Sequence, residues 1–454
     1  MEVRRQKIGE DDTPTSVART TDVVVCGGGP AGICAAVAAA RGGLKVLLIE
    51  QYGFLGGMAT GGLVNPIYGF GYFEKGKQLV TGIPEELVQA LARLEGGTLG
   101  HQRRIECETC DSHDACPTHG VSSLLSFDPE AFKYAALTML EKEGVEILLY
   151  SRVLTALMDS ATVMGVAVAT KSGRQVIRGA VVIDATGDGD VAAAAGNPYQ
   201  VGRSQDGAIQ PQSLIFRVGN VKRDENRFRQ ILPNLPGRRS ALSVLLFRLP
   251  RTGEYIVNCD SGIHGADPLR VEDLTRVHAE TLKATRDIMA AIRTEIPGCQ
   301  DSYLVSTAAH LGIRESRRIV GEYVLTKDDV LNCRKFPDGI CKAAFPIDIH
   351  DLTESPDDCN PMLCVKCGDY YEIPYRCLVP CAIDNLLLAG RCISGTHEAH
   401  GSYRVMGTCM AVGQAAGTAA VLATTKGVVP RRLDGVSVRR ALIENGVTLS
   451  GAKC

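Results

Sequence analysis

The sequence predicts an α/β protein with a Rossmann-like dinucleotide-binding domain and an inserted α+β domain. Two observations support this fold class. An apolar strand at residues 21–26 runs into glycines at 27–32, an Ala-rich helix follows, and a second strand at 44–50 ends in an acid. This strand–helix–strand order is typical of a dinucleotide-binding unit. At 454 residues the chain is also too long for one ordinary core, which favours two domains.

Each position of the glycine motif has a physical task. Gly27 allows the tight turn, Gly29 lets the backbone approach a pyrophosphate, and Gly32 lets the helix pack closely on the strand. Pro30 suits the first helical turn, where a missing N–H costs nothing. The N–H groups of that turn attract phosphate. Glu50, at the end of the second strand, can accept hydrogen bonds from a ribose.

Composition and charge exclude several classes of partner. A net charge of −2 gives no global attraction to nucleic acid or to an anionic membrane. The first 20 residues are polar and unlike a signal peptide, and the longest apolar runs are too short or too mixed to span a bilayer. Seventeen cysteines without an export signal favour a reducing compartment. We therefore expect a cytoplasmic protein without a membrane span.

After the loop at 51–62, the pattern continues as helices and strands of the same domain. Asp128 can cap a helix that has Pro129 in its first turn and ends at Gly144. Four strands are then expected, at 145–150, 152–158, 163–170 and 175–183. Near the C-terminus an apolar strand pattern at 377–389 precedes a long helix at about 406–426.

Residues 200–330 have a different sequence pattern from the segments on either side. Strand-like pieces at 213–218 and 254–257 are mixed with a helix near 271–295. The expected organisation is a discontinuous dinucleotide-binding domain at 20–200 and 330–430, a substrate or cap domain at 200–330, and a Cys/His-rich insertion at 100–120.

Three further segments carry a resemblance to flavoproteins. Val-Val-Ile-Asp-Ala-Thr-Gly-Asp at 181–188 resembles the second fingerprint of two-dinucleotide-domain flavoproteins. Asn-Leu-Leu-Leu-Ala-Gly-Arg at 385–391 resembles their third, where a strand ends in Gly beside the flavin ribityl chain. The loop at 55–60 is similar to the one that crosses the FAD pyrophosphate and ribityl. Together these segments resemble the glutathione-reductase-like FAD fold.

A closer resemblance is to the broad FAD-dependent oxidoreductase family, often described as xanthan-lyase-like and distantly related to the flavin subunit of heterodisulfide reductase. It rests on residues 313–322, 373–380 and 391–406 and spans about 20–425. The resemblance implies FAD as the cofactor but does not identify the substrate, because members of the family are chemically diverse. The positions that it and the glycine motif assign to FAD are Gly27, Gly29, Pro30, Ala31, Gly32, Glu50, Gln51, Gly57, Met58, Ala59, Thr60, Val153, Ala185, Thr186, Gly187, Gly390, Arg391 and Gly407.

Two motifs of the pyridine-nucleotide disulfide reductases are missing from the sequence. There is no second GxGxxG between residues 130 and 330, and no CxxxxC follows the first helix. We therefore expect that electrons do not come from a stably docked nicotinamide.

The segment 391–404 is the best candidate for the active site. The predicted catalytic residues are Arg391, His397, His400, Tyr403 and Arg404. In the family fold the helix that follows points at the flavin pyrimidine and can stabilise negative charge there. An arginine could do the same or bind an anionic substrate, and either histidine could move a proton near neutral pH. The alternative is that these side chains cap the helix or form internal ion pairs.

A second polar cluster holds Arg314, Arg317 and Arg318, with Asp348 and His350 farther along. Three arginines in five residues could face a carboxylate-bearing substrate. The alternative, favoured for Arg318, is a salt-bridged interface with Glu315 and Glu322.

Cysteines form two groups in polar regions. The candidate metal ligands are Cys107, Cys110, Cys116, Cys364 and Cys367. CxxC places two thiolates on one turn, which suits either Zn²⁺ or an iron–sulfur cluster. Three interpretations stay open: a 4Fe–4S cluster, zinc, or unligated thiols. A flavin without a nicotinamide domain needs another electron route, which favours iron–sulfur.

The leading expectation is an FAD-dependent oxidoreductase that acts on a small anionic substrate by hydride transfer at flavin N5, with electrons relayed by the cysteine-bound centre. One alternative is a dehydrogenase of amines, alcohols or hydroxy acids, with zinc in a structural role. Another is an electron-transfer subunit of a larger redox complex. The expected partners are a small-molecule substrate and, as a candidate, an electron-transfer protein, whereas nucleic acid is not expected and the oligomeric state is open.

Overall fold

The computed structural model describes residues 17–70, 78–103, 123–232, 242–259, 261–350, 363–366 and 369–449. Its larger sheet has seven strands in the order β5-β2-β1-β8-β7-β6, and β18 also pairs with β8. These strands are β1 (Val17–Cys26), β2 (Val46–Ile49), β5 (Glu146–Leu148), β6 (Arg152–Asp159), β7 (Thr162–Thr170), β8 (Gly173–Asp184) and β18 (Leu386–Leu388). The predicted α/β class with a Rossmann-like sheet is confirmed.

The register of the larger sheet brings several strand ends to one edge. β1, β2, β5, β8 and β18 run parallel, whereas β6 and β7 form an antiparallel extension. Cys26 lies opposite both Ile49 and Asp184, and Leu388 also lies opposite Asp184. β1 pairs with β2 on one side and with β8 on the other. Ligands of open α/β sheets bind at such a switch point.

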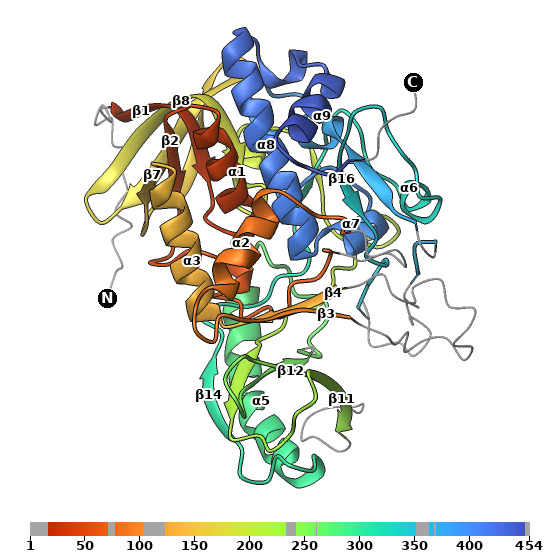
Figure 1. Ribbon diagram of the computed structural model, residues 1–454. Coiled ribbons are helices and arrows are strands. Elements are labelled where there is room, and N and C mark those ends of the chain that lie inside the picture. The colour runs from red at the N-terminus through yellow and green to blue at the C-terminus, as the bar shows by residue number, and fades with distance from the viewer. Residues whose placement is uncertain are drawn as a thin grey trace, which may run out of the picture.

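Helices cover this sheet, and the most intimate helix pair is α1 (Pro30–Arg41) with α8 (Met406–Lys426), which lie side by side in Figure 1. A Cβ at Gly413 would stand 2.0 Å from the Ala31 carbonyl oxygen, and one at Gly417 would stand 2.2 Å from that of Ala35. Only glycine therefore allows this approach. α8 is long and apolar enough to cross a membrane, but 89% of its apolar window is buried inside the protein, as in a core helix.

Further helices and short strand pairs lie around the larger sheet. The helices are α2 (Ile83–Ala92), α3 (Pro129–Lys142), α4 (Asp190–Ala194), α6 (Lys327–Leu331), α7 (His397–Tyr403) and α9 (Gly435–Glu444), with 3-10 turns η1 (Gly57–Ala59), η2 (Tyr375–Leu378) and η3 (Pro430–Arg432). Two-stranded pairings join β3 (Thr98–Arg103) to β4 (Ser123–Phe127), β9 (Tyr199–Gln200) to β15 (Arg318–Ile319), and β16 (Gly339–Ala343) to β17 (Tyr371–Pro374).

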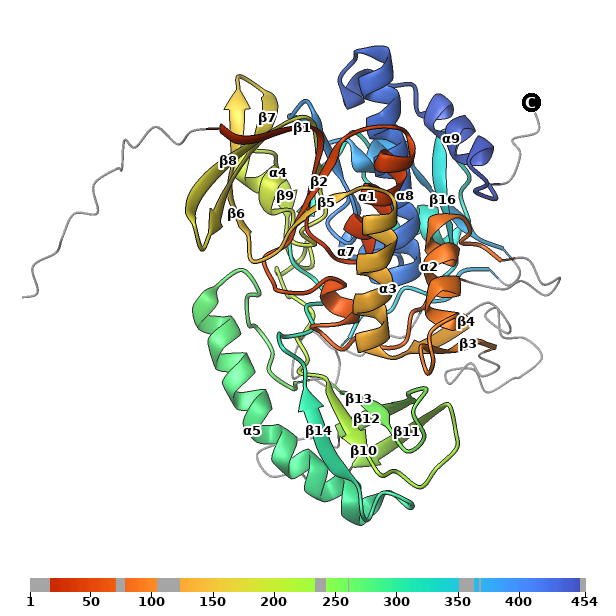
Figure 2. The same ribbon diagram turned by 60° about the vertical axis from the view of Figure 1, so that its left-hand side comes forward.

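A second sheet has the order β11-β12-β13-β10-β14 and packs on one long helix, α5 (Val271–Glu295). Its strands are β10 (Phe216–Gly219), β11 (Arg227–Leu232), β12 (Leu242–Arg248), β13 (Tyr255–Cys259) and β14 (Tyr303–Thr307). Figure 2 shows this unit below the larger sheet. Its buried apolar residues form a core of their own. The domain boundaries at 200 and 330 stay predictions, and most of the insertion predicted at 100–120 lies outside the described residues.

Most predicted elements are present, including the long helices and the Asp128 cap, whose carboxylate accepts from the Glu130 and Ala131 N–H groups. The expectation for 377–389 was wrong in part. Only Leu386–Leu388 is a strand, and Cys377 lies in the 3-10 turn η2, which follows Pro374. α7 was also not expected, because its seven residues carry little periodicity.

Candidate functional site

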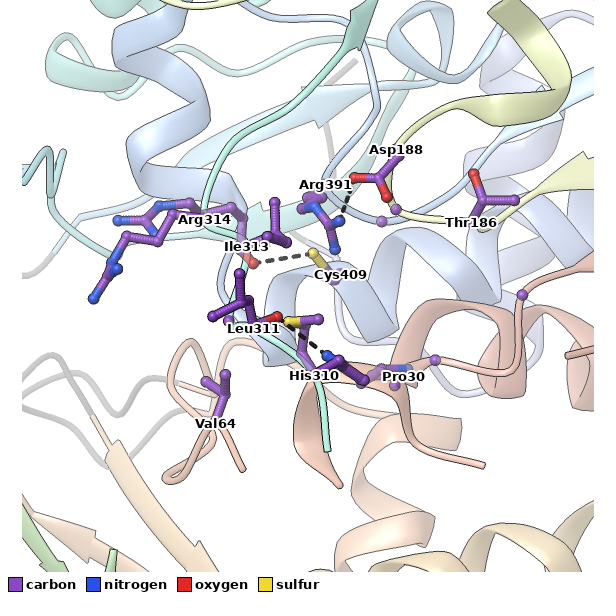
Figure 3. A pocket seen from close by; sticks show the side chains of 18 of the residues that line it. Pro30, Val64, Thr186, Asp188, His310, Leu311, Ile313, Arg314, Arg391 and Cys409 are labelled. Atoms are coloured by element: carbon purple, nitrogen blue, oxygen red, sulfur yellow. Dashed lines mark hydrogen bonds and ion pairs between the residues drawn. The ribbon is translucent and has the colours of Figure 1, made fainter. Parts of the chain in front are cut away.

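A cavity of about 740 Å³ lies at the carboxyl ends of the parallel strands. Its wall comes from the first turn of α1, the ends of β2, β8 and β18, the loop after β5, and the segments 309–314 and 404–406. Figure 3 shows Pro30, Thr186, His310, Arg314 and Arg391 around the same space. Its volume falls in the range of small-molecule and cofactor sites.

The first turn of α1 forms one wall. Gly29 precedes the helix with φ −73°, and no side chain caps the N–H groups of that turn. A Cβ at Gly29 would meet nothing within 4 Å, so its hydrogens face open space. Gly27 and Gly32 are needed for close packing instead. Gly27 has φ +108°, and a Cβ there would stand 2.4 Å from the Ala185 oxygen. A Cβ at Gly32 would stand 1.8 Å from the Gly27 oxygen. The cradle fits a pyrophosphate.

Glu50 lies at the end of β2 and is buried on the cavity wall. Its Oε2 accepts a hydrogen bond from the Gly28 N–H at 2.8 Å, and Oε1 accepts from the Tyr52 N–H at 2.9 Å. Burial raises the pKa of this carboxyl, while the backbone donors oppose that shift. The carboxylate is thus fixed where a ribose of a dinucleotide could donate to it.

The end of β8 is organised by Asp184, which is fully buried. Its carboxylate accepts from the Thr186 hydroxyl at 2.7 Å and from the Ala192 N–H at 2.9 Å. Burial raises the pKa of Asp184 to about 6. These bonds shape the turn that presents Ala185, Thr186 and Gly187 to the cavity.

Arg391 follows β18 and reaches across to that turn. Its Nη2 lies 2.5 Å from Asp188 Oδ1, which also accepts from the Ser316 hydroxyl at 2.6 Å. A Cβ at Gly187 would stand 2.5 Å from Arg391 Nη1, so the guanidinium packs against bare backbone. Burial lowers the pKa of Arg391, but the Asp188 carboxylate outweighs it and the net shift is upward.

The structure brings most of the predicted FAD residues to the cavity wall. Those that line it are Gly27, Gly29, Pro30, Ala31, Glu50, Gln51, Gly57, Met58, Val153, Ala185, Thr186, Gly187, Gly390 and Arg391.

Four predicted FAD residues do not line the cavity. Gly32 packs against Gly27, and Gly407 donates its N–H to the Tyr68 carbonyl at 2.9 Å. Ala59 ends η1 and Thr60 follows it; both are buried, and the Thr60 hydroxyl donates to the Leu55 carbonyl at 2.7 Å. Their part in FAD binding stays a prediction.

The predicted catalytic residues divide in the same way. Arg391 and Arg404 line the cavity, whereas His397, His400 and Tyr403 do not. All three are almost fully buried: His397 lies 2.8 Å from Glu315, and the Tyr403 hydroxyl donates to the Ile393 carbonyl at 2.9 Å.

The reason lies in α7. Thr396 caps it, its hydroxyl oxygen accepting from the Ala399 N–H, and the helix turns His397 inward towards Glu315. Arg318 completes this buried cluster by an ion pair with Glu315, as predicted for Arg318. Glu322 instead lies 3.9 Å from Arg431.

Sequence reasoning did not assign His310 to the site. Its ring stacks on Tyr52 with centroids 4.9 Å apart, and its Nδ1 lies 3.1 Å from the Leu311 carbonyl oxygen. Burial lowers the pKa of His310. A single histidine between apolar residues carried no signal that could have found it.

Asp348 and His350 belong to the second polar cluster of the sequence, whose arginines were expected to face a carboxylate-bearing substrate or to form ion pairs. The Asp348 carboxylate lies 3.5 Å from Arg404 Nη2 and 3.6 Å from His350 Nε2, and all three residues line the cavity together with Arg314. Burial raises the pKa of Asp348, but His350, Arg404 and Arg314 hold it well below its usual range.

The predicted metal ligands Cys107, Cys110, Cys116 and Cys367 lie outside the described residues. Cys364 is described and is half-buried. Within the part of the chain that the structure describes, no group of three or more His, Cys, Asp or Glu side chains could hold a metal ion. Iron–sulfur and zinc binding stay predictions.

The structure is similar to solved structures of other proteins. A flavin-dependent brominase has 14% identity and a TM-score of 0.50, with 94% of this chain and 83% of that chain covered. A geranylgeranyl bacteriochlorophyll reductase-like protein from Thermoplasma acidophilum has 17% identity and a TM-score of 0.49, with coverages of 94% and 83%. At 14% identity the likeness to the brominase shows the fold alone. No curated protein matches the sequence.

The model of one protein family, described as FAD dependent oxidoreductase, matches residues 22–442. The match includes the glycine motif, the turn after β8 and the segment after β18, which are the elements that build the cavity. The chain is an enzyme that belongs to the FAD-dependent oxidoreductase family.

Proposed function

We propose that this enzyme uses FAD to oxidise or reduce a small anionic substrate by hydride transfer at flavin N5. The observation that carries the proposal is one cavity of about 740 Å³ lined both by the glycine motif and by Arg314 and Arg404. Cofactor and substrate can then meet without leaving the protein. The favoured direction is reduction of an unsaturated or carbonyl-type substrate.

The chain's own residues support a defined place for FAD. The uncapped first turn of α1 suits the pyrophosphate, and Glu50 suits a ribose. FAD supplies the redox chemistry when it is bound. Arg391 keeps a positive charge beside the cavity because Asp188 holds it in position. That charge favours ligands that become more negative on reduction.

Proton transfer by His397 or His400 belongs to the proposal as a finer point. Both side chains lie behind the cavity wall, so either would have to act through another group. His310 and His350 line the cavity itself and are the competing candidates. Replacing each histidine with glutamine and measuring the rate of flavin reoxidation or reduction separates the four.

The electron route includes, as a proposal, an iron–sulfur centre whose ligands come from one or both of two cysteine groups, Cys107, Cys110 and Cys116 in the first and Cys364 and Cys367 in the second. What supports it is the CxxC spacing and the missing nicotinamide motif. Anaerobic purification tests FAD binding and the iron–sulfur centre in one experiment. Bound FAD with iron and acid-labile sulfide supports the iron–sulfur relay. Bound FAD with zinc contradicts the relay and supports the zinc alternative, and bound FAD without metal contradicts both metal proposals. Protein that neither contains nor takes up FAD contradicts the central proposal.

A further inference from the structure

We propose that the unit formed by the second sheet and α5 binds a hydroxyl group on an apolar part of the substrate, and that Asn258 on β13 and His278 on α5 recognise that hydroxyl. This inference rests on the proposed function, because both residues line the same cavity as the cofactor residues. It concerns a neutral group, so it does not depend on the charge of the substrate. Figure 2 shows α5 and β13 in the unit below the larger sheet.

The strand pattern of β13 turns Asn258 towards the cavity. Tyr255, Val257 and Cys259 belong to the apolar core that the second sheet forms with α5. Because side chains alternate along a strand, Ile256 and Asn258 share the opposite face. Ile256 belongs to a different apolar cluster, and Asn258 lines the cavity. An asparagine therefore stands on the cavity side of the sheet.

Helix α5 brings His278 to the same cavity. His278 lines it together with Leu274, which lies four residues earlier and thus on the same face of the helix. Val277, the neighbour of His278, packs in one cluster with Ile256 of β13. The wall around His278 therefore adjoins the wall around Asn258.

Both polar side chains lack a partner. Asn258 Oδ1 is buried and makes no hydrogen bond to any described residue. Within the described part of the chain, the His278 ring makes no hydrogen bond, ion pair or ring contact. An unpaired buried amide oxygen destabilises a protein, and asparagine is unfavourable in a strand. A ligand that supplies the missing hydrogen bonds offsets these costs.

A hydroxyl group suits this pair because it both donates and accepts hydrogen bonds. A half-turn of the Asn258 amide exchanges its oxygen and nitrogen, so the amide can meet either role. A neutral imidazole also has one donor and one acceptor nitrogen. The apolar side chains of Ile215, Leu274 and Leu311 line the cavity as well, and they can bury the rest of the substrate.

The experiment uses the FAD-loaded enzyme and two isomeric probes. The hydroxyl of para-cresol donates a hydrogen bond, whereas anisole has the same atoms and no donor. Calorimetry measures the affinity of each probe. We expect para-cresol to bind at least about fivefold more tightly than anisole, the scale of one net hydrogen bond. Equal affinities, or no binding of para-cresol at millimolar concentration, overturn the proposal.

Variants test the two assigned residues. Asn258→Leu and His278→Phe keep the approximate size of each side chain and remove its hydrogen bonds. Each should weaken the binding of para-cresol by about threefold to tenfold and change that of anisole by less than about twofold. The matched control is Asn226→Leu, the same exchange at an exposed position before β11 and outside the cavity wall. Equal effects of Asn258→Leu and Asn226→Leu on the affinity for para-cresol overturn the proposal.

Stability without a probe separates recognition from a structural role. Because Asn258 has no partner to lose, Asn258→Leu should not lower the midpoint of urea unfolding. A clearly lower midpoint shows a structural role and overturns the assignment of Asn258.

The FAD content of each preparation separates this inference from the proposed function. Protein that does not bind FAD contradicts the proposed function. A fully loaded enzyme that does not distinguish para-cresol from anisole contradicts the hydroxyl site alone.

Discussion

Asp188 and Arg391 form an ion pair, Oδ1 to Nη2 at 2.5 Å, that joins the turn after β8 to the segment after β18. The two strands are neighbours in the sheet, but the residues are far apart in the sequence. Their side chains are 32% and 14% exposed, so the pair lies between surface and core. It therefore fixes two walls of the cavity relative to each other.

A double-mutant cycle with Asp188→Asn and Arg391→Gln should give a coupling energy of about 1–2 kcal/mol in the free energy of unfolding, because a half-buried pair is screened less than an exposed one. Urea unfolding of the four proteins measures it. The control is Lys222 with Asp301, a pair at 2.5 Å whose side chains are 66% and 62% exposed and whose coupling we expect to be much weaker because water screens it. Equal coupling in the two cycles contradicts this interpretation.

Gly29 and Gly32 should respond oppositely to substitution by alanine. A Cβ at Gly29 meets no protein atom and its φ of −73° suits any residue, so Gly29→Ala should keep the stability within about 0.5 kcal/mol. It should nevertheless lose FAD, because the methyl group enters the space beside the first turn of α1. FAD retention on gel filtration and urea unfolding measure the two effects.

Gly32→Ala should lose stability first, by about 1–3 kcal/mol, because its Cβ would stand 1.8 Å from the Gly27 carbonyl oxygen. If Gly29→Ala keeps FAD at wild-type affinity, the pyrophosphate does not lie against this turn.

The cofactor wall could be predicted because its signals are local. The glycine motif, Glu50 at a strand end and Gly390 each follow an apolar strand within a few residues. The site around Asp348 could not be built from the sequence, since Arg314 and Arg404 come from different segments without a shared spacing. His397 shows the other limit. Its residue type suggested proton transfer, but only the direction of α7 places it beside Glu315 and behind the wall.

Arg318 should be essential for stability. It is 3% exposed and pairs with Glu315, which is fully buried, and it also donates to the Gly202 and Gly395 carbonyls. Arg318→Met should cost about 3–5 kcal/mol, since Glu315 is left charged and buried. The matched control is Arg334→Met, which removes a 57% exposed side chain that pairs with Asp329, and its cost should be clearly smaller.

Adding Glu315→Gln to Arg318→Met should restore part of the loss in urea unfolding. No recovery in the double variant would show that the hydrogen bonds of Arg318 matter more than its charge.

His400 should make the protein less stable in acid. It is 1% exposed, packs edge-on against Tyr403 with ring centroids 5.4 Å apart, and lies near arginines. Burial, followed by the charges of Arg318 and Arg404, lowers its pKa well below the ordinary value of 6.5. Below pH 6.5 the unfolded chain takes up a proton that the folded protein excludes. The free energy of unfolding should therefore decrease as the pH is lowered below 6.5, by up to about 1.4 kcal/mol per pH unit from this residue.

In His400→Asn the slope of the free energy of unfolding against pH should decrease between pH 6.5 and pH 5 by the amount that corresponds to up to one proton. Above pH 7 the free energies of unfolding of the two proteins should differ by a constant amount. Urea unfolding across that range measures the slope. An unchanged slope in His400→Asn means that His400 takes up its proton without unfolding. In that case the histidine is reachable from solvent or from the cavity, and the interpretation of α7 as a buried support for the wall is wrong.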